Sequence, residues 1–459
     1  MLKKLFKPFR LPRQRTGPEQ PTVLEAHEHR LSCADFSRNS ANVAVRLQHA
    51  DFQAYLVGGC VRDSLLSVKP KDFDVATSAT PEQVRSEFRN SRIIGRRFKL
   101  VHVHFGRELI EVATFRSNHV QDDDIANNDQ SAHDVSGRIL RDNVYGTMED
   151  DAQRRDFTMN ALYFDVSSEK IYDYSTGFAD IQRRLIRLIG DPEQRYLEDP
   201  VRMLRAIRFA AKLDFEIEDS TAEPIRRLAY LLRDIPSARL YEEVLKLFLS
   251  GHAVRTYELL CEYELFAELF PGTAKALIRN HENVDRLLRN AFQSTDKRVN
   301  MDRPVTPAFL FAALLWPSLT VRAIGLQNDG MHPLPAMQEA AHQVLLEQLQ
   351  RIAVPKRFSI PTREIWDMQD RLLRRAGKRA DTLLAHPRFR AAYDFLLLRE
   401  SAGEQLDGLG DWWTEYQDAS DSLRREMISN LSSKSSKPRK RKRSKPRTGG
   451  PASAESGHE

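Results

Sequence analysis

The chain has 459 residues, of which 41% are hydrophobic, and this is enough for about two to four folded domains. No apolar run approaches 18 residues and the N-terminus lacks the apolar core of a secretory signal, so we expect no membrane span and no export. The three cysteines, Cys33, Cys60 and Cys261, have neither metal-binding nor redox spacing, which is typical of a cytoplasmic protein.

The net charge of +6 is unevenly distributed along the chain. Residues 434–447 carry nine Lys or Arg and no acid, and residues 1–16 carry six more basic residues. Without these two segments the chain is acidic overall. Such a composition is compatible with an enzyme that has a metal-carboxylate site. The basic C-terminal segment predicts a nuclear localisation signal in a eukaryote or a nucleic-acid tether in a bacterium.

The N-terminal segment, residues 1–42, is basic, then polar and interrupted by proline, and we predict that it is largely disordered. Residues 43–57 run from a helix into a first strand. Residues 54–77 then predict strand, Gly-Gly turn, short helix, turn and second strand.

The Gly-Gly turn is suited to binding phosphate. Gly58 and Gly59 have no side chains, so a phosphate can approach the backbone N–H groups at the start of the helix. Arg62 and Asp63 occupy the first turn of that helix.

Asp72 and Asp74 are two residues apart in the second predicted strand, so both carboxylates point to one face. Two carboxylates held this close repel each other, and a divalent cation such as Mg²⁺ or Mn²⁺ relieves the repulsion. The alternative is a solvated strand edge. The upstream glycines favour a metal site for phosphoryl chemistry, in which two ions hold the attacking and leaving oxygens.

The next segment predicts a helix with Thr80 as its N-cap and Gln83 in a capping box, followed by a hairpin of strands at 100–105 and 109–115. Glu111 lies in the second of these strands. If its strand neighbours the Asp pair, Glu111 becomes a third metal ligand, and otherwise it pairs with an arginine. Residues 117–138 are polar and aperiodic and predict a mobile loop.

Residues 149–162 predict a helix that places Arg155, Asp156 and Asn160 on adjacent turns. In a functional interpretation Arg155 binds a triphosphate, and Asp156 binds metal or ribose. In a structural one they form a solvated helix face. A strand at 171–174 completes a mixed α/β domain at 43–190.

From residue 191 the pattern is helical, which predicts a neck at 191–255, a body at 256–430 and a disordered basic tail at 431–459. The predicted helix at 198–213 carries a polar stripe beside its apolar one. A carboxylate and guanidinium groups on adjacent turns could read an adenine edge or meet a phosphate, and the alternative is a surface ion-pair ladder. The stripe comprises Asp199, Arg202, Arg205 and Arg208.

The motifs together resemble the class II nucleotidyltransferases of the polymerase β superfamily, which comprise bacterial poly(A) polymerases and CCA-adding enzymes. The Gly-Gly/Arg-Asp/Asp-Phe-Asp set, residues 154–161 (Arg-Arg-Asp-Phe-Thr-Met-Asn-Ala) and residues 198–209 carry the resemblance over about residues 43–270. The stretch 93–103 looks like the signature that distinguishes poly(A) polymerases from CCA-adding enzymes, and the basic tail is similar to that of bacterial poly(A) polymerases.

The resemblance implies a polymerase β-like catalytic head at 43–190, a helical neck at 191–255 that binds nucleotide and RNA, and a helical body and C-terminal RNA-binding region at 256–430. It implies a template-independent enzyme that uses Mg²⁺ to transfer AMP from ATP to RNA 3′ ends and releases pyrophosphate, with RNA-decay or RNA-chaperone proteins as partners. Asp72 and Asp74 would hold two metals, with Asp156 or Glu111 as the third carboxylate. The triphosphate would be held by Gly58, Gly59, Arg62 and Asp63, adenine would be recognised by Asp199 and Arg202, and the nucleotide would be braced by Arg155, Asn160, Arg205 and Arg208.

Two alternatives remain open at the level of sequence. A CCA-adding enzyme would incorporate CTP at a tRNA end that lacks CCA. A non-catalytic RNA-binding adaptor on the same fold would not need the carboxylates Asp72, Asp74 and Asp156, all of which are present.

Overall fold

The computed structural model describes residues 20–95, 99–117, 131–133, 139–142 and 144–434. The chain divides into two compact units, the first extending to Ile360 and the second beginning at Pro361. Residues 96–98 of the poly(A) polymerase-like signature lie outside the described residues, as do residues 1–19 and 435–459. The first unit contains the sheet and the predicted site.

An eight-stranded mixed sheet forms the head of the first unit, in the order β1-β10-β9-β2-β3-β6-β5-β4. The β3–β6 pair is parallel and the other pairs are antiparallel. The strands are β1 Thr22–Leu24, β2 Ala54–Val57, β3 Phe73–Thr77, β4 Ser91–Ile94, β5 Leu100–Phe105, β6 Glu108–Thr114, β9 Leu162–Phe164 and β10 Ile171–Asp173. Two small sheets pair β7 Ser131–His133 with β8 Ile139–Asp142 and β11 Leu185–Ile186 with β12 Glu216–Ile217.

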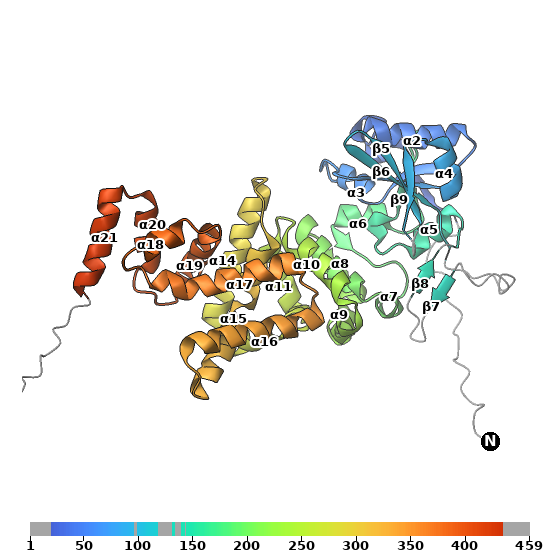
Figure 1. The fold of residues 1–459 in the computed structure, drawn as a ribbon. Coiled ribbons are helices and arrows are strands. Elements are labelled where there is room, and N and C mark those ends of the chain that lie inside the picture. The colour runs from blue at the N-terminus through green and yellow to red at the C-terminus, as the bar shows by residue number, and fades with distance from the viewer. Residues whose placement is uncertain (1–19, 96–98, 118–130, 134–138, 143, 435–459) are drawn as a thin grey trace, which may run out of the picture. The chain divides into compact units, whose positions relative to one another are not determined.

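Short helices pack on this sheet. Helix α2 contacts β2, β3 and β6, whereas α4 contacts β4, β5 and β6 (Figure 1). The predicted Thr80–Gln83 capping box begins α4, and the predicted hairpin of β5 and β6 is also present. The head helices are α1 Ala26–His29, α2 Arg38–His49, α3 Gly59–Leu65, α4 Pro81–Glu87, α5 Met148–Arg154 and α6 Gly177–Arg183.

Three predictions about the head are wrong in part. Residues 20–42 are structured, because β1 pairs with β10 and thereby closes one edge of the sheet. The predicted loop contains β7 at 131–133. The predicted helix at 149–162 stops at Arg154, because Arg195 Nη2 donates to the carbonyl oxygens of residues 154 and 155 at 2.7 and 2.6 Å. Those carbonyls would otherwise accept bonds from the next helical turn.

The predicted helix at 198–213 is present as α8 Val201–Leu213, and a separate short helix, α7 Pro192–Glu198, precedes it. Pro200 interrupts them, because a residue before proline avoids helical geometry and Asp199 is extended at φ −148° and ψ 94°. Asp199 Oδ1 then accepts from the N–H of Val201 at 3.2 Å at the start of α8.

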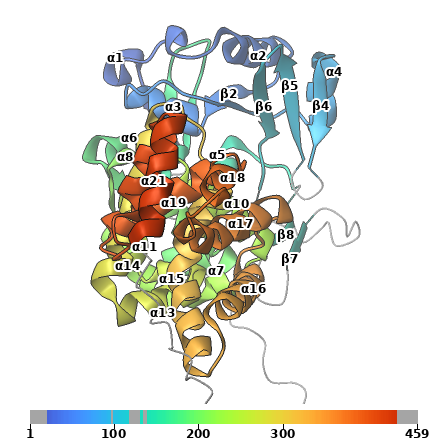
Figure 2. The ribbon, with the colours of Figure 1, turned by 60° about the vertical axis from the view of Figure 1, so that its left-hand side comes forward.

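The rest of the first unit is helical, as predicted. Helices α15 and α16 lie side by side (Figures 1 and 2). The helices after α8 are α9 Asp219–Leu228, α10 Ser237–Phe248, α11 Ala253–Glu262, α12 Leu265–Leu269, α13 Pro271–Arg279, α14 His281–Asn300, α15 Pro307–Asn328 and α16 Pro333–Arg351.

Helix α15 corrects the expectation that no apolar run approaches 18 residues. By length and composition it is the one described helix that could cross a membrane, and over half of its apolar window is buried inside the protein. A helix that is apolar on all sides and covered by neighbours is typical of the core of a large helical domain.

The second unit holds most of α17 Lys356–Leu373, together with α18 Arg379–Leu384, α19 Phe389–Ser401, α20 Leu409–Asp418 and α21 Asp421–Lys434. Its core contains the buried side chains of Leu372, Leu396, Trp413 and Tyr416. Because α21 continues to Lys434, the first residues of the predicted tail at 431–459 are helical.

Candidate active site

Two adjacent parallel strands bring the predicted carboxylates together. Asp74 in β3 stands opposite Glu111 in β6, and Asp72 immediately precedes β3. Parallel partners in register share one face of the sheet. The Glu111 side chain is 48% exposed, and its Oε1 lies 3.3 Å from His102 Nε2.

The Gly-Gly turn lies directly against Asp74. Gly58 has a φ of +78°, a conformation that disfavours side chains. A Cβ at this position would stand 3.7 Å from Asp74 Oδ2 and 3.6 Å from Arg155 Nη1. Gly59 begins α3, where a Cβ would meet Arg62 Nη2 at 3.7 Å. The turn, the carboxylate and Arg155 therefore form one wall of a single site.

The electrostatics of this wall suit a divalent cation. Burial and the nearby charges of Glu111 and Asp72 raise the pKa of Asp74 to about 6, against an opposing effect of Arg155. Within the described residues, no three His, Cys, Asp or Glu side chains converge as a ready metal site. Mg²⁺ commonly takes one or two protein carboxylates and completes its shell with substrate phosphates and water, so the residues present fit this ion.

A hydrogen-bonded chain links the head to α8. Arg62 pairs with Asp63 through two nitrogens and donates from Nη1 to Asn160 Oδ1 at 2.6 Å. Asn160 Nδ2 donates to Asp156 Oδ1 at 3.0 Å, and Arg205 Nε donates to Asp156 Oδ2 at 2.7 Å. The sequence placed Asn160 and Asp156 on one helix. They lie instead on a loop and a short 3₁₀ turn, and still meet.

Asp156 is fully engaged within the protein. Burial alone would raise its pKa, but the charge of Arg205 and hydrogen bonds from three donor residues, Asn160, Arg205 and Phe157, hold the pKa well below the ordinary value. The third donor is the backbone N–H of Phe157, at 2.8 Å from Oδ1. Both carboxylate oxygens thus accept hydrogen bonds from the protein, and this arrangement suits Asp156 to holding Arg205 of α8 against the head.

Three arginines surround one aromatic ring. The guanidinium carbons of Arg62, Arg205 and Arg208 stand 5.0, 5.6 and 4.7 Å from the centre of the Phe209 ring. Arg62 and Arg205 have carboxylate partners. Arg208 forms no ion pair with any described residue, and its buried Nε has no hydrogen-bond partner there. Burial and the charge of Arg205 lower the pKa of Arg208, so this position favours an incoming anion.

Arg155 is held by residues that the sequence analysis did not select. Its Nε and Nη2 donate to Asp151 Oδ2 at 3.2 and 3.0 Å, and its Nε donates to the Tyr163 hydroxyl at 3.0 Å. Tyr163 in turn donates to Asp151 at 2.8 Å. The four-residue spacing of Asp151 and Arg155 on a helix was the available sequence signal for this pair.

The predicted adenine readers do not pair with each other. Asp199 Oδ2 accepts from Arg239 Nη2 at 2.7 Å, whereas Arg202 donates to Glu198 at 3.1 Å and to the carbonyl oxygen of Arg195 at 2.6 Å. Arg202 is buried, so the alternative of a surface ion-pair ladder does not hold at this position. The sequence analysis missed Arg239, which lies 40 residues away on α10.

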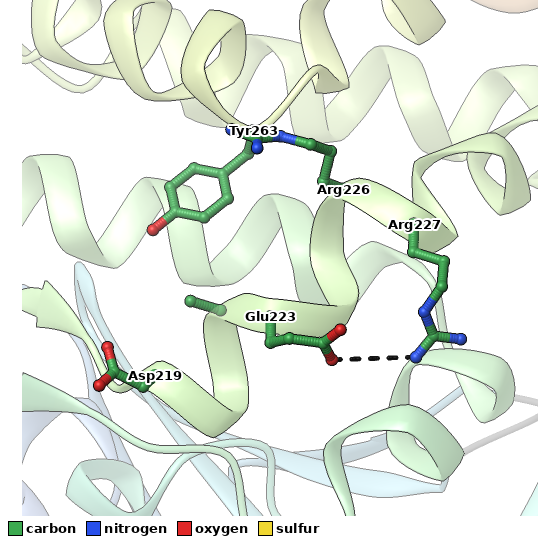
Figure 3. A pocket seen from close by; sticks show the side chains of 6 residues that line it. Asp219, Glu223, Arg226, Arg227 and Tyr263 are labelled. Carbon is green, nitrogen blue, oxygen red and sulfur yellow. Dashed lines mark ion pairs between the residues drawn. The ribbon is translucent and has the colours of Figure 1, made fainter.

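A separate pocket of about 630 Å³ lies at α9, and no predicted site residue lines it. Figure 3 shows Tyr263 facing the helix that carries Glu223 and Arg227, with the ion pair between the last two marked. The wall of the pocket is completed by Asp219, Ala222 and Arg226.

Comparison with protein families finds three matching models along this chain. "Poly A polymerase head domain" matches residues 54–187, which include the carboxylate site. "Probable RNA and SrmB- binding site of polymerase A" matches residues 214–277, which include the α9 pocket. "Polymerase A arginine-rich C-terminus" matches residues 329–448.

Known relatives extend this match over nearly the whole chain. Poly(A) polymerase I of Escherichia coli O6:H1 is 48% identical over 434 residues, which are 94% of this chain and 93% of that protein. Poly(A) polymerase I of Haemophilus influenzae is 45% identical over 93% of this chain and 95% of its own length. The CCA-adding enzyme of Lactobacillus helveticus is 36% identical but matches only 50% of this chain and 55% of its own.

Solved structures share the fold. The CCA-adding enzyme of Bacillus stearothermophilus in complex with CTP has a TM-score of 0.53 and 25% identity, covering 85% of this chain and 82% of its own. The Thermotoga maritima CCA-adding enzyme complexed with tRNA_CCA has a TM-score of 0.57 and 17% identity, with 86% of each chain covered. On the family models and the near full-length relatives, the chain belongs to the bacterial poly(A) polymerase family of polymerase β-like nucleotidyltransferases.

Proposed function

We propose that this protein is a template-independent polynucleotide adenylyltransferase that adds AMP from ATP to RNA 3′ ends. The observation that carries the proposal is the match to poly(A) polymerases I over nearly the full chain, at the same residues that place Asp74 beside the Gly58 turn. The RNA 3′ oxygen bonds to the α-phosphorus of ATP, the bond to pyrophosphate breaks, and the hydroxyl proton is lost.

Asp72 and Asp74 are the proposed ligands of Mg²⁺, with Mn²⁺ as a substitute and Glu111 as the third carboxylate. Bound divalent ions would lower the pKa of the RNA 3′-hydroxyl and neutralise the departing pyrophosphate. Glu111 fits this role better than Asp156, because it stands in register with Asp74 and is half exposed. We assign Asp156 to positioning Arg205 instead, since both of its oxygens are already engaged.

The triphosphate is proposed to lie between the Gly58–Gly59 turn and the arginines around Phe209. Gly58 and Gly59 at the start of α3 have no side chains of their own to keep a phosphate from the backbone N–H groups. Arg208 forms no ion pair with any described residue, although the charges of Glu243 and Asp156 act on it, and a phosphate oxygen would supply an acceptor for its buried Nε. The neighbouring guanidinium groups of Arg62 and Arg205 are held in position by their ion pairs with Asp63 and Asp156.

Base choice is proposed to depend on Asp199 and Arg202, each fixed by a different partner. Arg239 orients the Asp199 carboxylate, and Glu198 orients the Arg202 guanidinium. A hydrogen-bonding edge held in place rejects a base that lacks the matching donors and acceptors, because buried polar groups then remain unpaired.

The proposed partners are RNA 3′ ends, bound in part by the helical segment that matches the RNA-binding family model. Proteins of RNA decay or RNA remodelling are further proposed partners, and the proposed location is the cytoplasm. The three cysteines are free thiols in the structure, as this compartment requires.

Substitution of the carboxylates tests the assignment. We expect Asp72→Asn and Asp74→Asn each to abolish AMP incorporation into a short oligo(A) primer, while the affinity for that primer stays within about twofold of the wild type. The matched control is Glu82→Gln, an exposed carboxylate of the same head that forms a surface ion pair with Lys99. Turnover near the wild-type rate in either Asp variant would contradict the metal assignment.

A further inference from the structure

Within residues 361–434, the described part of the second unit, one strongly basic segment lies in an otherwise acidic sequence. Residues 371–379 carry five Lys or Arg and no acid, whereas the rest of residues 361–434 carries seven basic and thirteen acidic residues. The segment spans the end of α17 and the turn into α18. Four of its five cations form no ion pair with any described residue, and only Arg374 does, with Asp370. The four are Arg371, Arg375, Lys378 and Arg379.

Arg375 occupies an unusual position among them. Its guanidinium carbon lies 4.9 Å from the centre of the Trp412 ring. Its Nε is buried and has no hydrogen-bond partner in the part of the chain that the structure describes. A buried donor without an acceptor is costly, so a group that accepts from it is expected.

The aromatic side of this contact is rigidly built. Trp412 stacks on Tyr416 with ring centres 4.7 Å apart and an angle of 14° between the planes. The Tyr416 hydroxyl donates to Asp381 at 2.7 Å, and Trp413 Nε1 donates to the carbonyl oxygen of Leu372 at 3.0 Å. These bonds fix α20 against the basic turn. Trp412 itself is only partly buried, whereas Trp413 is fully buried.

Another arginine of the same unit also lies against an aromatic ring, but it has a carboxylate partner within the protein. Arg390 lies 5.4 Å from the centre of the Tyr393 ring, and its Nε pairs with Asp394 at 2.9 Å. Its charge is thus neutralised within the protein. Arg375 has the same kind of aromatic contact but forms no ion pair with any residue that the structure describes.

We propose that Arg375 and Trp412, with Arg371, Lys378 and Arg379 around them, form a contact site for single-stranded RNA in the second unit. Arg375 would donate to a phosphate, and a base would pack against the exposed part of Trp412. Unpaired cations next to a partly exposed aromatic ring are the combination that binds single strands without choosing sequence, which suits a homopolymeric tail. An acidic peptide would use the charges but not the ring. The inference rests on the proposed function only in taking RNA as the ligand.

The test is the affinity of the full-length chain for a fluorescein-labelled oligo(A) 20-mer, measured by anisotropy without ATP at several salt concentrations. We expect Arg375→Ala to weaken binding about fivefold or more and to lower the salt slope by about 0.7. Trp412→Leu should weaken binding with the slope unchanged. Arg390→Ala is the matched control and should stay within about twofold of the wild type.

Several results would overturn the inference. They are an Arg375→Ala affinity equal to that of Arg390→Ala, or displacement of the RNA by polyglutamate as effectively as by unlabelled oligo(A). If Trp412→Leu shifts the thermal midpoint, Trp412→Phe replaces it, because phenylalanine keeps the packing. If Arg375→Ala does so, Arg375→Lys replaces that variant, because lysine keeps the charge. AMP incorporation is assayed separately. If the wild type incorporates AMP and Arg375→Ala binds RNA normally, the proposed RNA contact site is refuted and the proposed function stands. If the wild type binds RNA through Arg375 but does not incorporate AMP, the proposed function is refuted and the contact site stands.

Discussion

The pair of Asp156 and Arg205 allows a sharp test of whether Asp156 positions the site or holds metal. The Asp156 side chain is 12% exposed and that of Arg205 is 33% exposed. Removal of one partner from a buried pair costs about 3–5 kcal/mol. Because Arg205 is one-third exposed, we expect Asp156→Asn to lower the free energy of unfolding by about 2–3 kcal/mol. The substitution leaves Arg205 near Arg208 and Arg62 without its neutralising charge.

The assay is a double-mutant cycle of Asp156→Asn, Arg205→Met and the double variant, read by urea unfolding of the full chain. We expect a coupling free energy of about 2 kcal/mol, so that the double variant is less destabilised than the two single changes would sum to. AMP incorporation should fall by about 10- to 100-fold in each single variant, because α8 and its arginines shift relative to the Gly58 turn. Unchanged stability of Asp156→Asn, together with complete loss of turnover and no coupling to Arg205, would refute the positioning role.

Three further predictions address other parts of the site. Gly58→Ala should lower AMP incorporation and cost about 1–3 kcal/mol of stability, because an alanine at φ +78° is strained even though its Cβ has room, and the urea midpoint measures this. Arg239→Met should raise the KM for ATP and reduce the discrimination between ATP and CTP while changing stability by less than about 1 kcal/mol, because the Arg239 side chain of its pair with Asp199 is 39% exposed; a KM unchanged for both nucleotides would contradict this. Since the pKa of Asp74 is raised to about 6, the metal-free protein should lose up to about 3 kcal/mol of stability as the pH rises from about 4 to about 6, Mg²⁺ should restore it above pH 6, and a flat profile in Asp74→Asn is the control.

Local signals in the sequence were sufficient for the elements that begin with a specific cap or turn. The Thr80–Gln83 capping box and the hairpin of β5 and β6 are both present, because each depends on residues within a few positions of one another. Gly58 was likewise recognisable, since its positive φ is a property that glycine supplies.

Long-range contacts explain what the sequence could not show. The helical period of residues 149–162 continues past Arg154, but Arg195 from another helix captures the carbonyl groups that would have extended α5. The N-terminal strand β1 exists because β10, almost 150 residues later, offers it an edge. Neither partner can be identified from spacing alone.

The same distinction holds within the site. Residue types in a motif indicated Asp74, Arg62 and Arg205, and the structure brings them into one connected region. The partner that orients each side chain was not visible from the motif. Arg239 holds Asp199 from a separate helix, and Tyr163 holds Arg155 from β9, a strand that begins at the last residue of the helix predicted at 149–162.

Nucleotide selection tests the central claim most directly. The purified chain is incubated with Mg²⁺, each nucleoside triphosphate in turn, and either an oligo(A) primer or a tRNA that lacks its CCA end. The proposed function predicts long extension of the oligo(A) primer with ATP alone and no incorporation of CTP into either RNA. Addition of two C residues to the tRNA from CTP would identify a CCA-adding enzyme and contradict the account.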